Sequence, residues 1–248
     1  MKESRADMPA VTCLVLAGGL GTRLQQAVAG LPKCLAPILG RPFLVYQLDA
    51  LNRSAIKRVV LCTGHLAEQV ERAIGTTHDG MTISYSRESR PLGTGGAARL
   101  AVTGIPDAED FLVVNGDSFL EADLQTAYKT YVATGRVPMM LLARVSDTAR
   151  YGRVEVHDAT ATTTSVARFL EKGAGGSGWI NAGIYFLPRE TLLALPPHGT
   201  VSLERDLFPA LASAGKLTAM CTPGRFIDIG TPESYGAADL FFRVSGSP

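Results

Sequence analysis

The chain has 248 residues, 46% of them hydrophobic, and its 24 basic and 23 acidic residues leave a formal net charge of +1. This size and composition allow one domain with a sizeable core. The near balance of charge argues against a nucleic-acid or membrane-surface partner, and no apolar run approaches the roughly 18 residues that a transmembrane helix needs.

The N-terminal and cysteine patterns favour a cytoplasmic protein. Residues 1–10 carry several charges and lack the apolar stretch of a secretory signal, so we expect a flexible lead-in there. The four cysteines have no C-x-x-C spacing, and the four histidines form no ligand pattern. The common zinc motifs are therefore not present in the sequence.

Strands and helices alternate along the chain from residue 11. Strands are expected over residues 11–17, 58–62, 81–86, 110–115, 137–144 and 179–187, with helices over 43–52, 66–74, 97–102, 124–133 and 203–214 and from 232 onward. This order predicts an α/β fold of Rossmann-like type, a doubly wound and mostly parallel sheet with helices on both faces. Residues 153–157 and 166–170 look like a small inserted β-hairpin. Because no linker or repeat divides residues 11–243, we expect one domain there.

The first predicted strand ends in a loop with glycines at positions 18, 19 and 21. Glycine lets backbone N–H groups approach an anion closely, and a helix start after such a loop favours phosphate. Arg23 and Lys33 add two cations beside the loop, the planar guanidinium group of arginine and the compact ammonium group of lysine. The P-loop pattern fails because no Gly-Lys-Ser or Gly-Lys-Thr occurs, and the dinucleotide pattern fails because Leu24 stands where its third glycine belongs. We therefore expect the loop to bind a polyphosphate through a motif that differs from both of these patterns.

Two aspartates and a second glycine loop follow later predicted strands. Asp117 closes the turn after the strand over 110–115, where it suits either a magnesium ion or a turn that caps its own backbone. Asp228 lies between two isoleucines, so on an extended segment its side chain faces away from theirs. The stretch Pro91–Ala97 enters a helix, and its backbone can bind a flat ring by the edge.

These segments together resemble the sugar-nucleotidyltransferase family, also called nucleotide-sugar pyrophosphorylases. Residues 16–24 read LAGGLGTRL and residues 32–38 read PKCLAPI, similar to the family pattern G-G-x-G-T-R-L followed by P-K-x-x-x-P. The NGD turn at 115–117 and FIDIGTP at 226–232 resemble two further family segments, with Phe226 in place of the usual tryptophan. The resemblance covers about residues 11–242. It implies the GT-A-like nucleotidyltransferase fold without a C-terminal β-helix.

The resemblance implies roles for individual residues. The nucleotide is expected within residues 11–120, on Leu16, Ala17, Gly18, Gly19, Gly21, Thr22, Gly93, Thr94 and Asn115. The sugar phosphate is expected within residues 121–243, on Gly152, Glu171, Lys172, Asn181 and Glu204. The implied catalytic residues are Arg23, Lys33, Asp117 and Lys172, and the implied ligands of Mg²⁺ are Asp117 and Asp228.

The resemblance also implies the reaction, in which a sugar 1-phosphate attacks the α-phosphorus of a nucleoside triphosphate and pyrophosphate leaves. Thymine-using members carry a glutamine in the second loop, and Gly95-Gly96 here predicts guanine instead. The expected substrates are GTP and D-glycero-α-D-manno-heptose 1-phosphate, for capsule or other surface polysaccharide. Mannose 1-phosphate, uridylyl transfer to a muramate or hexose 1-phosphate, and a non-catalytic sugar-nucleotide-binding subunit stay as alternatives. A homo-oligomer stays open.

Overall fold

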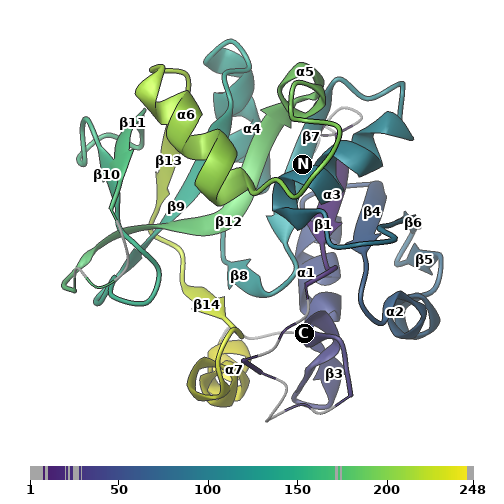
Figure 1. Cartoon of the computed structure of the whole chain (residues 1–248). Coiled ribbons are helices and arrows are strands. Elements are labelled where there is room, and N and C mark those ends of the chain that lie inside the picture. The colour runs from purple at the N-terminus through teal and green to yellow at the C-terminus, as the bar shows by residue number, and fades with distance from the viewer. Residues whose placement is uncertain are drawn as a thin grey trace, which may run out of the picture.

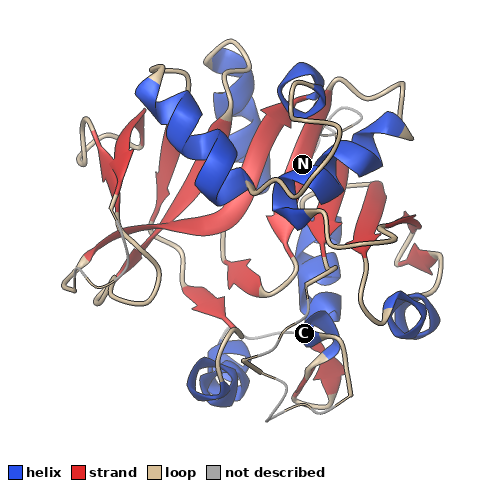
Figure 2. Ribbon diagram, viewed as in Figure 1, coloured by secondary structure: helices blue, strands red, loops and turns tan. Residues whose placement is uncertain are grey.

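The structure is a computed structural model that describes residues 8, 11–19, 21, 23–24, 28, 30–170, 173 and 175–244. Its centre is a ten-stranded sheet in the order β10-β11-β13-β9-β12-β7-β1-β4-β6-β5 (Figures 1 and 2). The strands of this sheet are β1 (Thr12–Leu16), β4 (Arg58–Thr63), β5 (Thr77–His78), β6 (Met81–Arg87), β7 (Asp110–Asn115), β9 (Met139–Val145), β10 (Val154–Val156), β11 (Thr163–Phe169), β12 (Gly178–Pro188) and β13 (Thr218–Thr222).

The half of the sheet formed by the first strands is parallel, as the alternating pattern predicts. β1 pairs in parallel with β4 and with β7, and β4 pairs in parallel with β6. β1, β4 and β7 are rich in apolar residues, as is typical of strands that helices cover on both faces. The register sets Leu16 beside both Cys62 and Asn115, so the carboxyl ends of three strands open onto one edge of the sheet.

The other half of the sheet is mixed rather than parallel. β12 runs antiparallel between β7 and β9, while β13 is parallel to β9. The expected hairpin is present as β10 and β11. It extends the main sheet instead of forming a separate one, because β11 also pairs with β13.

Helices cover both faces of the sheet, as Figures 1 and 2 show. They are α1 (Phe43–Arg53), α2 (Ala67–Ile74) and α4 (Leu124–Ala133) on one face, with α3 (Gly93–Thr103), α5 (Arg189–Leu193) and α6 (Phe208–Ser213) on the other. Leu48 and Tyr131 belong to the apolar cluster under the first group, and Ala101 and Phe208 belong to the cluster under the second. The doubly wound arrangement is confirmed by these two cores.

Two helix boundaries differ from the sequence-based expectation. α3 begins at Gly93 rather than at Ala97. Gly95 N and Gly96 N donate hydrogen bonds to the carbonyl of Val201, and these bonds hold the extra first turn. The helical stretch expected over 203–214 consists of a π-helical segment, η2 (Leu203–Leu207), followed by α6. Pro209 explains this break, since it lacks the N–H that a continuous α-helix would use.

A smaller layer lies beneath the main sheet in Figure 1 and contains α7 (Pro232–Val244) with two short ribbons. The 3-10 turn η1 (Lys33–Leu35) leads into the first ribbon, in which β2 (Pro37–Ile38) pairs with β3 (Arg41–Pro42); in the second, β8 (Ser118–Leu120) pairs with β14 (Phe226–Asp228). The expected cap of α7 is present, because Ser234 N donates to Thr231 Oγ1 at 3.3 Å. Phe242 joins α7 to β8, with its ring centroid 5.1 Å from that of Phe119. This packing fixes the β8–β14 ribbon against the carboxyl end of β7.

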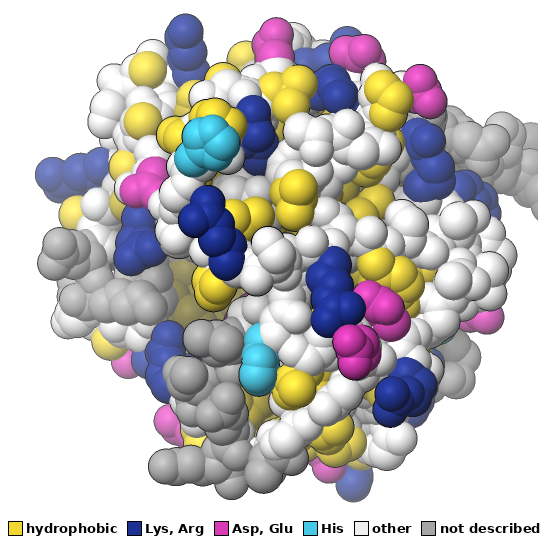
Figure 3. Space-filling model, turned by 45° about the vertical axis from the view of Figure 1, so that its right-hand side comes forward, with side chains coloured by type: hydrophobic (Ala, Val, Ile, Leu, Met, Phe, Trp, Pro, Cys, Tyr) yellow, Lys and Arg dark blue, Asp and Glu magenta, His cyan; other side chains and the backbone are white. Residues whose placement is uncertain are grey.

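Charged side chains are dispersed over the face in Figure 3, where basic and acidic groups alternate with uncharged surface. They form no continuous basic patch on that face, which agrees with the near-neutral net charge. Among the described residues, no helix combines the length and apolar character that crossing a membrane requires.

Gly116 in the turn between β7 and β8 is a position where we expect even a methyl group to be costly. A Cβ there would lie 2.7 Å from the carbonyl oxygen of Leu16 and 3.3 Å from Ala17 Cα. Since these atoms belong to the backbone of the central strand, they cannot move without separating β1 from β7. Gly116→Ala should lower the free energy of unfolding by about 1–3 kcal/mol, measured by urea denaturation.

The matched control is Gly104→Ala at the end of α3. Its φ of −84° is helical, and the nearest atom to a Cβ there lies at 3.5 Å, an ordinary contact. This variant should stay within about 0.5 kcal/mol of the wild type. Equal stability of the two alanine variants would contradict the close approach of β1 and the Gly116 turn.

Candidate active site

The glycine loop after β1 is held closely against the neighbouring strand ends. Ala17 N donates to the carbonyl of Cys62 at 2.8 Å, which ties the start of the loop to β4. A Cβ at Gly18 would lie 2.8 Å from Glu88 Oε1 and 3.3 Å from Gly64 N. Only glycine fits this approach without displacing a neighbour. The neighbours that a Cβ at Gly18 would meet are Glu88 and Gly64, and the binding of a phosphate by this loop stays a prediction.

The far end of the same loop reaches Lys33. Gly21 has a φ of +59°, and a Cβ there would lie 3.2 Å from Lys33 Cβ. Leu24 is 2% exposed and belongs to the apolar cluster around α7, so it anchors the chain after the loop. Arg23, beside it, is exposed. Thr22, expected to bind the nucleotide, lies outside the described residues.

Lys33 and Asp117 meet although 84 positions separate them. Lys33 Nζ lies 2.5 Å from Asp117 Oδ2, in an ion pair whose side chains are 17% and 43% exposed. Lys33 stands on the short turn η1, and Asp117 follows β7 directly. The structure therefore joins the first glycine loop, a cation and a partly open carboxylate at the carboxyl edge of the parallel strands, where ligands bind in this class of sheet.

Asp228 comes to the same place through the β8–β14 ribbon. The register sets Asp228 opposite Ser118, and Ile229 N donates to the carbonyl of Asp117 at 2.9 Å. The Asp228 carboxylate accepts hydrogen bonds from Tyr151 Oη at 2.6 Å and from Arg150 Nη2 at 3.1 Å. Burial, and then the hydrogen bond to Asp228, raise the pKa of Tyr151 above its usual value. Tyr151 therefore stays a protonated donor to this carboxylate at neutral pH.

The pair Asp117 and Asp228 fits a magnesium ion by the chemistry of its donors. Mg²⁺ prefers hard oxygen ligands, and it is usually held by one or two carboxylates together with substrate phosphates. The side chain of Asp117 is 43% exposed and that of Asp228 is 16% exposed, so one carboxylate faces solvent while the other is held by neighbours. Their role as metal ligands stays a prediction.

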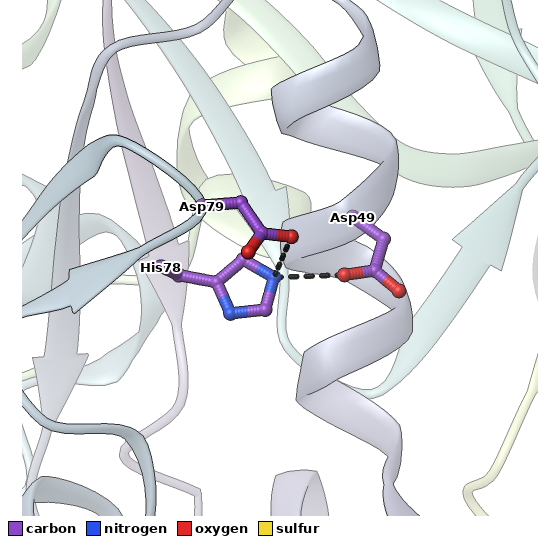
Figure 4. A group of neighbouring side chains, drawn as sticks. All are labelled: Asp49, His78 and Asp79. Atoms are coloured by element: carbon purple, nitrogen blue, oxygen red, sulfur yellow. Dashed lines mark hydrogen bonds and ion pairs between the residues drawn. The ribbon is translucent and has the colours of Figure 1, made fainter.

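A second group of metal-type side chains, Asp49, His78 and Asp79, lies elsewhere (Figure 4). His78 Nε2 is 2.7 Å from Asp49 Oδ1 and 3.9 Å from Asp79 Oδ2. Arg41 Nη2 takes the other oxygen of Asp49 at 2.9 Å. These contacts already neutralise Asp49 and dock the β5–β6 hairpin on α1, so we interpret the group as an ion-pair cluster. It is separate from the predicted magnesium pair.

The second glycine loop forms the first turn of α3 and is bonded largely within the protein. Gly95 N and Gly96 N donate to Val201 O, at 2.8 and 3.2 Å. These two N–H groups are therefore used within the protein, and the nucleotide-binding roles of Gly93 and Thr94 stay predictions. Thr94 Oγ1 donates to Glu204 Oε2 at 2.7 Å and accepts from Leu203 N at 2.8 Å. The predicted ligand contacts of Thr94 and Glu204 would compete with their mutual bond.

Glu88 lies beside the predicted nucleotide loops and is absent from the sequence-based predictions. It follows β6 directly. A Cβ placed on Gly64 would lie 2.5 Å from Glu88 Oε1, and one placed on Gly18 would lie 2.8 Å from the same oxygen. Its Oε2 accepts a hydrogen bond from Leu92 N, at the entrance to α3. Partial burial raises the pKa of Glu88. The same rule that singled out Asp117, a carboxylate just after a parallel strand, would have found it.

The predicted sugar side is built on an irregularity in β12. The register with β9 shifts between Asn181 and Tyr185, and Gly183 in that bulge has a φ of +77°. Asn181 Oδ1 accepts from Gly183 N at 2.9 Å, and a Cβ at Gly183 would lie 2.7 Å from Ser118 Oγ. Bulges often re-aim side chains beside active sites. This one brings Asn181 to the same edge as the Asp117 turn.

The other sugar residues are placed in part. Gly152 has a φ of +78° and follows Tyr151, whose hydroxyl bonds Asp228, so the expected Tyr-Gly segment does reach the aspartate pair. Glu171 and Lys172, expected to bind the sugar phosphate, lie outside the described residues. Their roles stay predictions from the sequence.

Comparison with known proteins identifies similar chains over most of the length. The family model described as nucleotidyl transferase matches residues 12–243. A D-glycero-alpha-D-manno-heptose 1-phosphate guanylyltransferase from Aneurinibacillus thermoaerophilus is 33% identical over 225 residues, which cover 91% of this chain and 95% of that protein. A probable mannose-1-phosphate guanylyltransferase 2 from Arabidopsis thaliana is 34% identical over 90% of this chain. The chain spans 62% of the length of that plant protein.

Solved structures agree with the fold. The crystal structure of HddC from Yersinia pseudotuberculosis complexed with GMP-PN is 32% identical and superimposes with a TM-score of 0.78, covering 94% of this chain and 99% of that one. A UDP-glucose pyrophosphorylase complexed with UDP-glucose has the same TM-score of 0.78 at 19% identity. That second likeness concerns the fold alone.

Proposed function

The chain belongs to the nucleotidyl transferase family, and we propose that it transfers GMP from GTP to a sugar 1-phosphate with release of pyrophosphate. The observation that carries this proposal is the meeting of the first glycine loop, Lys33, Asp117 and Asp228 at one edge of the sheet. Similarity to guanylyltransferases over about nine-tenths of the chain supports the nucleotide and the class of acceptor.

The proposed reaction is an in-line displacement at phosphorus. An oxygen of the sugar phosphate forms a bond to the α-phosphorus of GTP, and the bond from that phosphorus to the bridging oxygen breaks, so that pyrophosphate leaves with the electron pair. The attacking phosphate is already anionic, so no side chain has to remove a proton. The enzyme then acts mainly by positioning the two phosphates and stabilising their charge.

The cations and carboxylates of the chain divide this work. We place Lys33 on the triphosphate because it stands beside Gly21 of the first loop. Arg23, exposed at the end of that loop, is suited to the leaving pyrophosphate. Asp117 and Asp228 would hold Mg²⁺, which when bound offsets the negative charge of both phosphate groups. Lys172 is proposed for the sugar phosphate on its sequence pattern.

Glu88 supports guanine as the base. An ionised carboxylate only accepts hydrogen bonds, and guanine is the one common base that offers two adjacent donors, N1–H and the 2-amino group. Its carboxylate lies between the two predicted nucleotide loops, against Gly18 on one side and bonded to Leu92 N on the other. Uracil and thymine present a single donor between two acceptors, so they would meet this carboxylate poorly.

The acceptor is proposed to be D-glycero-α-D-manno-heptose 1-phosphate, with mannose 1-phosphate second. A relative named as a heptose 1-phosphate guanylyltransferase is 33% identical and one named as a probable mannose-1-phosphate guanylyltransferase is 34% identical, which supports these two acceptors. Asn181 and Gly152 are the described residues that we expect to contact the sugar, because Gly152 follows Tyr151, whose hydroxyl bonds Asp228, and Asn181 lies at the bulge of β12. The product would serve surface polysaccharide synthesis.

A pyrophosphate-release assay over four nucleoside triphosphates and several sugar 1-phosphates tests the function. We expect kcat/KM for GTP to exceed that for UTP and dTTP by at least about tenfold, a difference of about 1.4 kcal/mol in transition-state binding. Equal turnover of UTP would favour the uridylyl alternative. GTP turnover with mannose 1-phosphate alone would overturn the heptose assignment, and no turnover in any well would favour a non-catalytic binding subunit.

We also propose that the protein works in the cytoplasm. All four cysteines are buried and free. Burial raises the pKa of Cys34 to about 12, so this thiol is unreactive despite its neighbour Lys33. Reduced, buried thiols of this kind are usual in cytoplasmic proteins.

A further inference from the structure

Gln47 is a buried polar residue of α1 whose side chain spans the turn that carries Asp117. It is 3% exposed. Its Nε2 donates to the carbonyl of Asn115 at 2.8 Å and to the carbonyl of Ser118 at 2.7 Å. These two residues stand immediately before and after Gly116-Asp117, so a single amide group holds both ends of the turn.

The orientation of this amide is determined by its partners. Both acceptors are carbonyl oxygens, so the nitrogen has to face them, because a flipped amide would set Oε1 against two oxygens. Within the described part of the chain, Oε1 of Gln47 is buried and has no hydrogen-bond partner. The side chain therefore uses both of its donors on the turn and leaves its own acceptor unpaired. A buried amide oxygen without a partner costs free energy, so its presence here calls for an explanation such as the two bonds to the turn.

The turn is also tied to the two strands that complete the site. Gly116 N donates to Leu16 O at 2.9 Å, which joins the turn to β1. The carbonyl of Asp117 accepts from Ile229 N at 2.9 Å, which joins it to the segment carrying Asp228. Gln47 supplies the third attachment, from the helix layer behind the sheet. Together these bonds fix the backbone on either side of the Asp117 carboxylate.

We propose that Gln47 is a positioning residue that holds the Asp117 turn in the geometry needed to bind a divalent cation beside Asp228. The inference rests on the proposed function, because it gives Gln47 a part in the metal site of that reaction. Groups that orient metal ligands through hydrogen bonds commonly change metal affinity or activity by about 10–100-fold when they are removed. Gln47 acts only through the backbone of the turn and touches no substrate.

Two substitutions separate positioning from bulk stability. Gln47→Met keeps most of the volume and removes both hydrogen bonds. Gln47→Glu keeps the shape, but its carboxylate faces two carbonyl oxygens and can donate a hydrogen bond only when protonated. The matched control is Asn52→Leu on the same helix, because Asn52 Nδ2 donates to a different turn at the carbonyl of Asp79, at 3.2 Å.

Mn²⁺ binding to the protein, followed by electron paramagnetic resonance of the free ion, gives a readout that does not depend on turnover. Gln47→Met should raise the Mn²⁺ dissociation constant by at least about tenfold. Backbone amides in residues 115–118 should exchange faster with deuterium in this variant. Asn52→Leu should lower the melting temperature without changing either quantity. A Gln47→Met variant that binds Mn²⁺ as the wild type does would overturn the inference.

The glutamate variant adds a pH signature. The ratio of its kcat to that of the wild type should rise as the pH falls from 8.5 to 6, while the ratio for Gln47→Met stays low and flat. A flat ratio for Gln47→Glu also overturns the inference, even if Gln47→Met fails to fold. Failure of the proposed function looks different, since the wild type would then release no pyrophosphate while its Mn²⁺ binding and amide exchange still depended on Gln47.

Discussion

Asp117→Asn is expected to lower kcat by at least about 100-fold, as does the loss of other groups that stabilise charge in a transition state. An amide keeps the size of the carboxylate but removes its charge, so it binds Mg²⁺ weakly and no longer pairs with Lys33 Nζ at 2.5 Å. Asp228→Asn should have an effect of similar size. Its carboxylate forms an ion pair with Arg150, and an asparagine would remove the negative charge that this guanidinium faces. Both variants are assayed by pyrophosphate release at saturating Mg²⁺.

Folding should survive both changes, because Asp117 is 43% exposed and neither substitution opens a cavity in the core. Asp79→Asn is the matched control, since Asp79 belongs to the separate cluster with Asp49 and His78. It should leave kcat within about twofold of the wild type, as surface changes away from a site usually do. A large loss of activity in Asp79→Asn with normal turnover in Asp117→Asn would move the functional metal to the Asp49 cluster.

The parts of the fold that depend on local pattern could be predicted from the sequence. The buried strand at 110–115 and the helix at 124–133 agree with β7 and α4, because an apolar run and an amphipathic period are properties of neighbouring residues. The glycine loop after β1 was also expected, since its motif is continuous. The identity of these elements required no knowledge of distant contacts.

The strand pairing that brings the carboxylates of Asp117 and Asp228 together could not be predicted from local sequence pattern. Asp117 and Asp228 meet because β8 pairs with β14, two three-residue strands that are too short to show a period. Glu88 is missed for a different reason, because it lies between the predicted strand over 81–86 and the predicted loop from Pro91, where no motif marks it. The anchoring of the second loop could not be predicted either, because Gly95 N and Gly96 N bond Val201 O, a residue more than a hundred positions away.

The glycines of the sequence motifs shape the backbone. The side chains that we propose to contact ligands, such as Glu88 and Asp117, directly follow neighbouring strands or their turns. Gly18 exemplifies this, because the absence of a Cβ there leaves room for the carboxylate of Glu88, which follows β6 directly. We therefore propose that Glu88 contributes to specificity for the base beside the second loop.

Glu88→Gln is expected to lower kcat/KM for GTP by at least about tenfold, because a hydrogen bond to a charged group is worth about 1.5–3 kcal/mol. Glutamine keeps an oxygen that can accept from Leu92 N, so the entrance to α3 should stay intact. Its amide nitrogen, however, would face a guanine donor. Inosine triphosphate, which lacks the 2-amino group, separates the two donors of the base. The wild type should prefer GTP to inosine triphosphate, and Glu88→Gln should reduce that preference.

The pH dependence gives an independent check on the same carboxylate. Burial raises the pKa of Glu88, so in the free enzyme it becomes protonated at a higher pH than an ordinary glutamate. Protonation removes an acceptor that guanine needs, so kcat/KM for GTP should fall as the pH drops through this raised pKa. The same acid limb should be absent from Glu88→Gln. An unchanged GTP to inosine triphosphate ratio together with an unchanged acid limb in the variant would show that Glu88 does not contact the base, and guanine recognition would have to be assigned elsewhere.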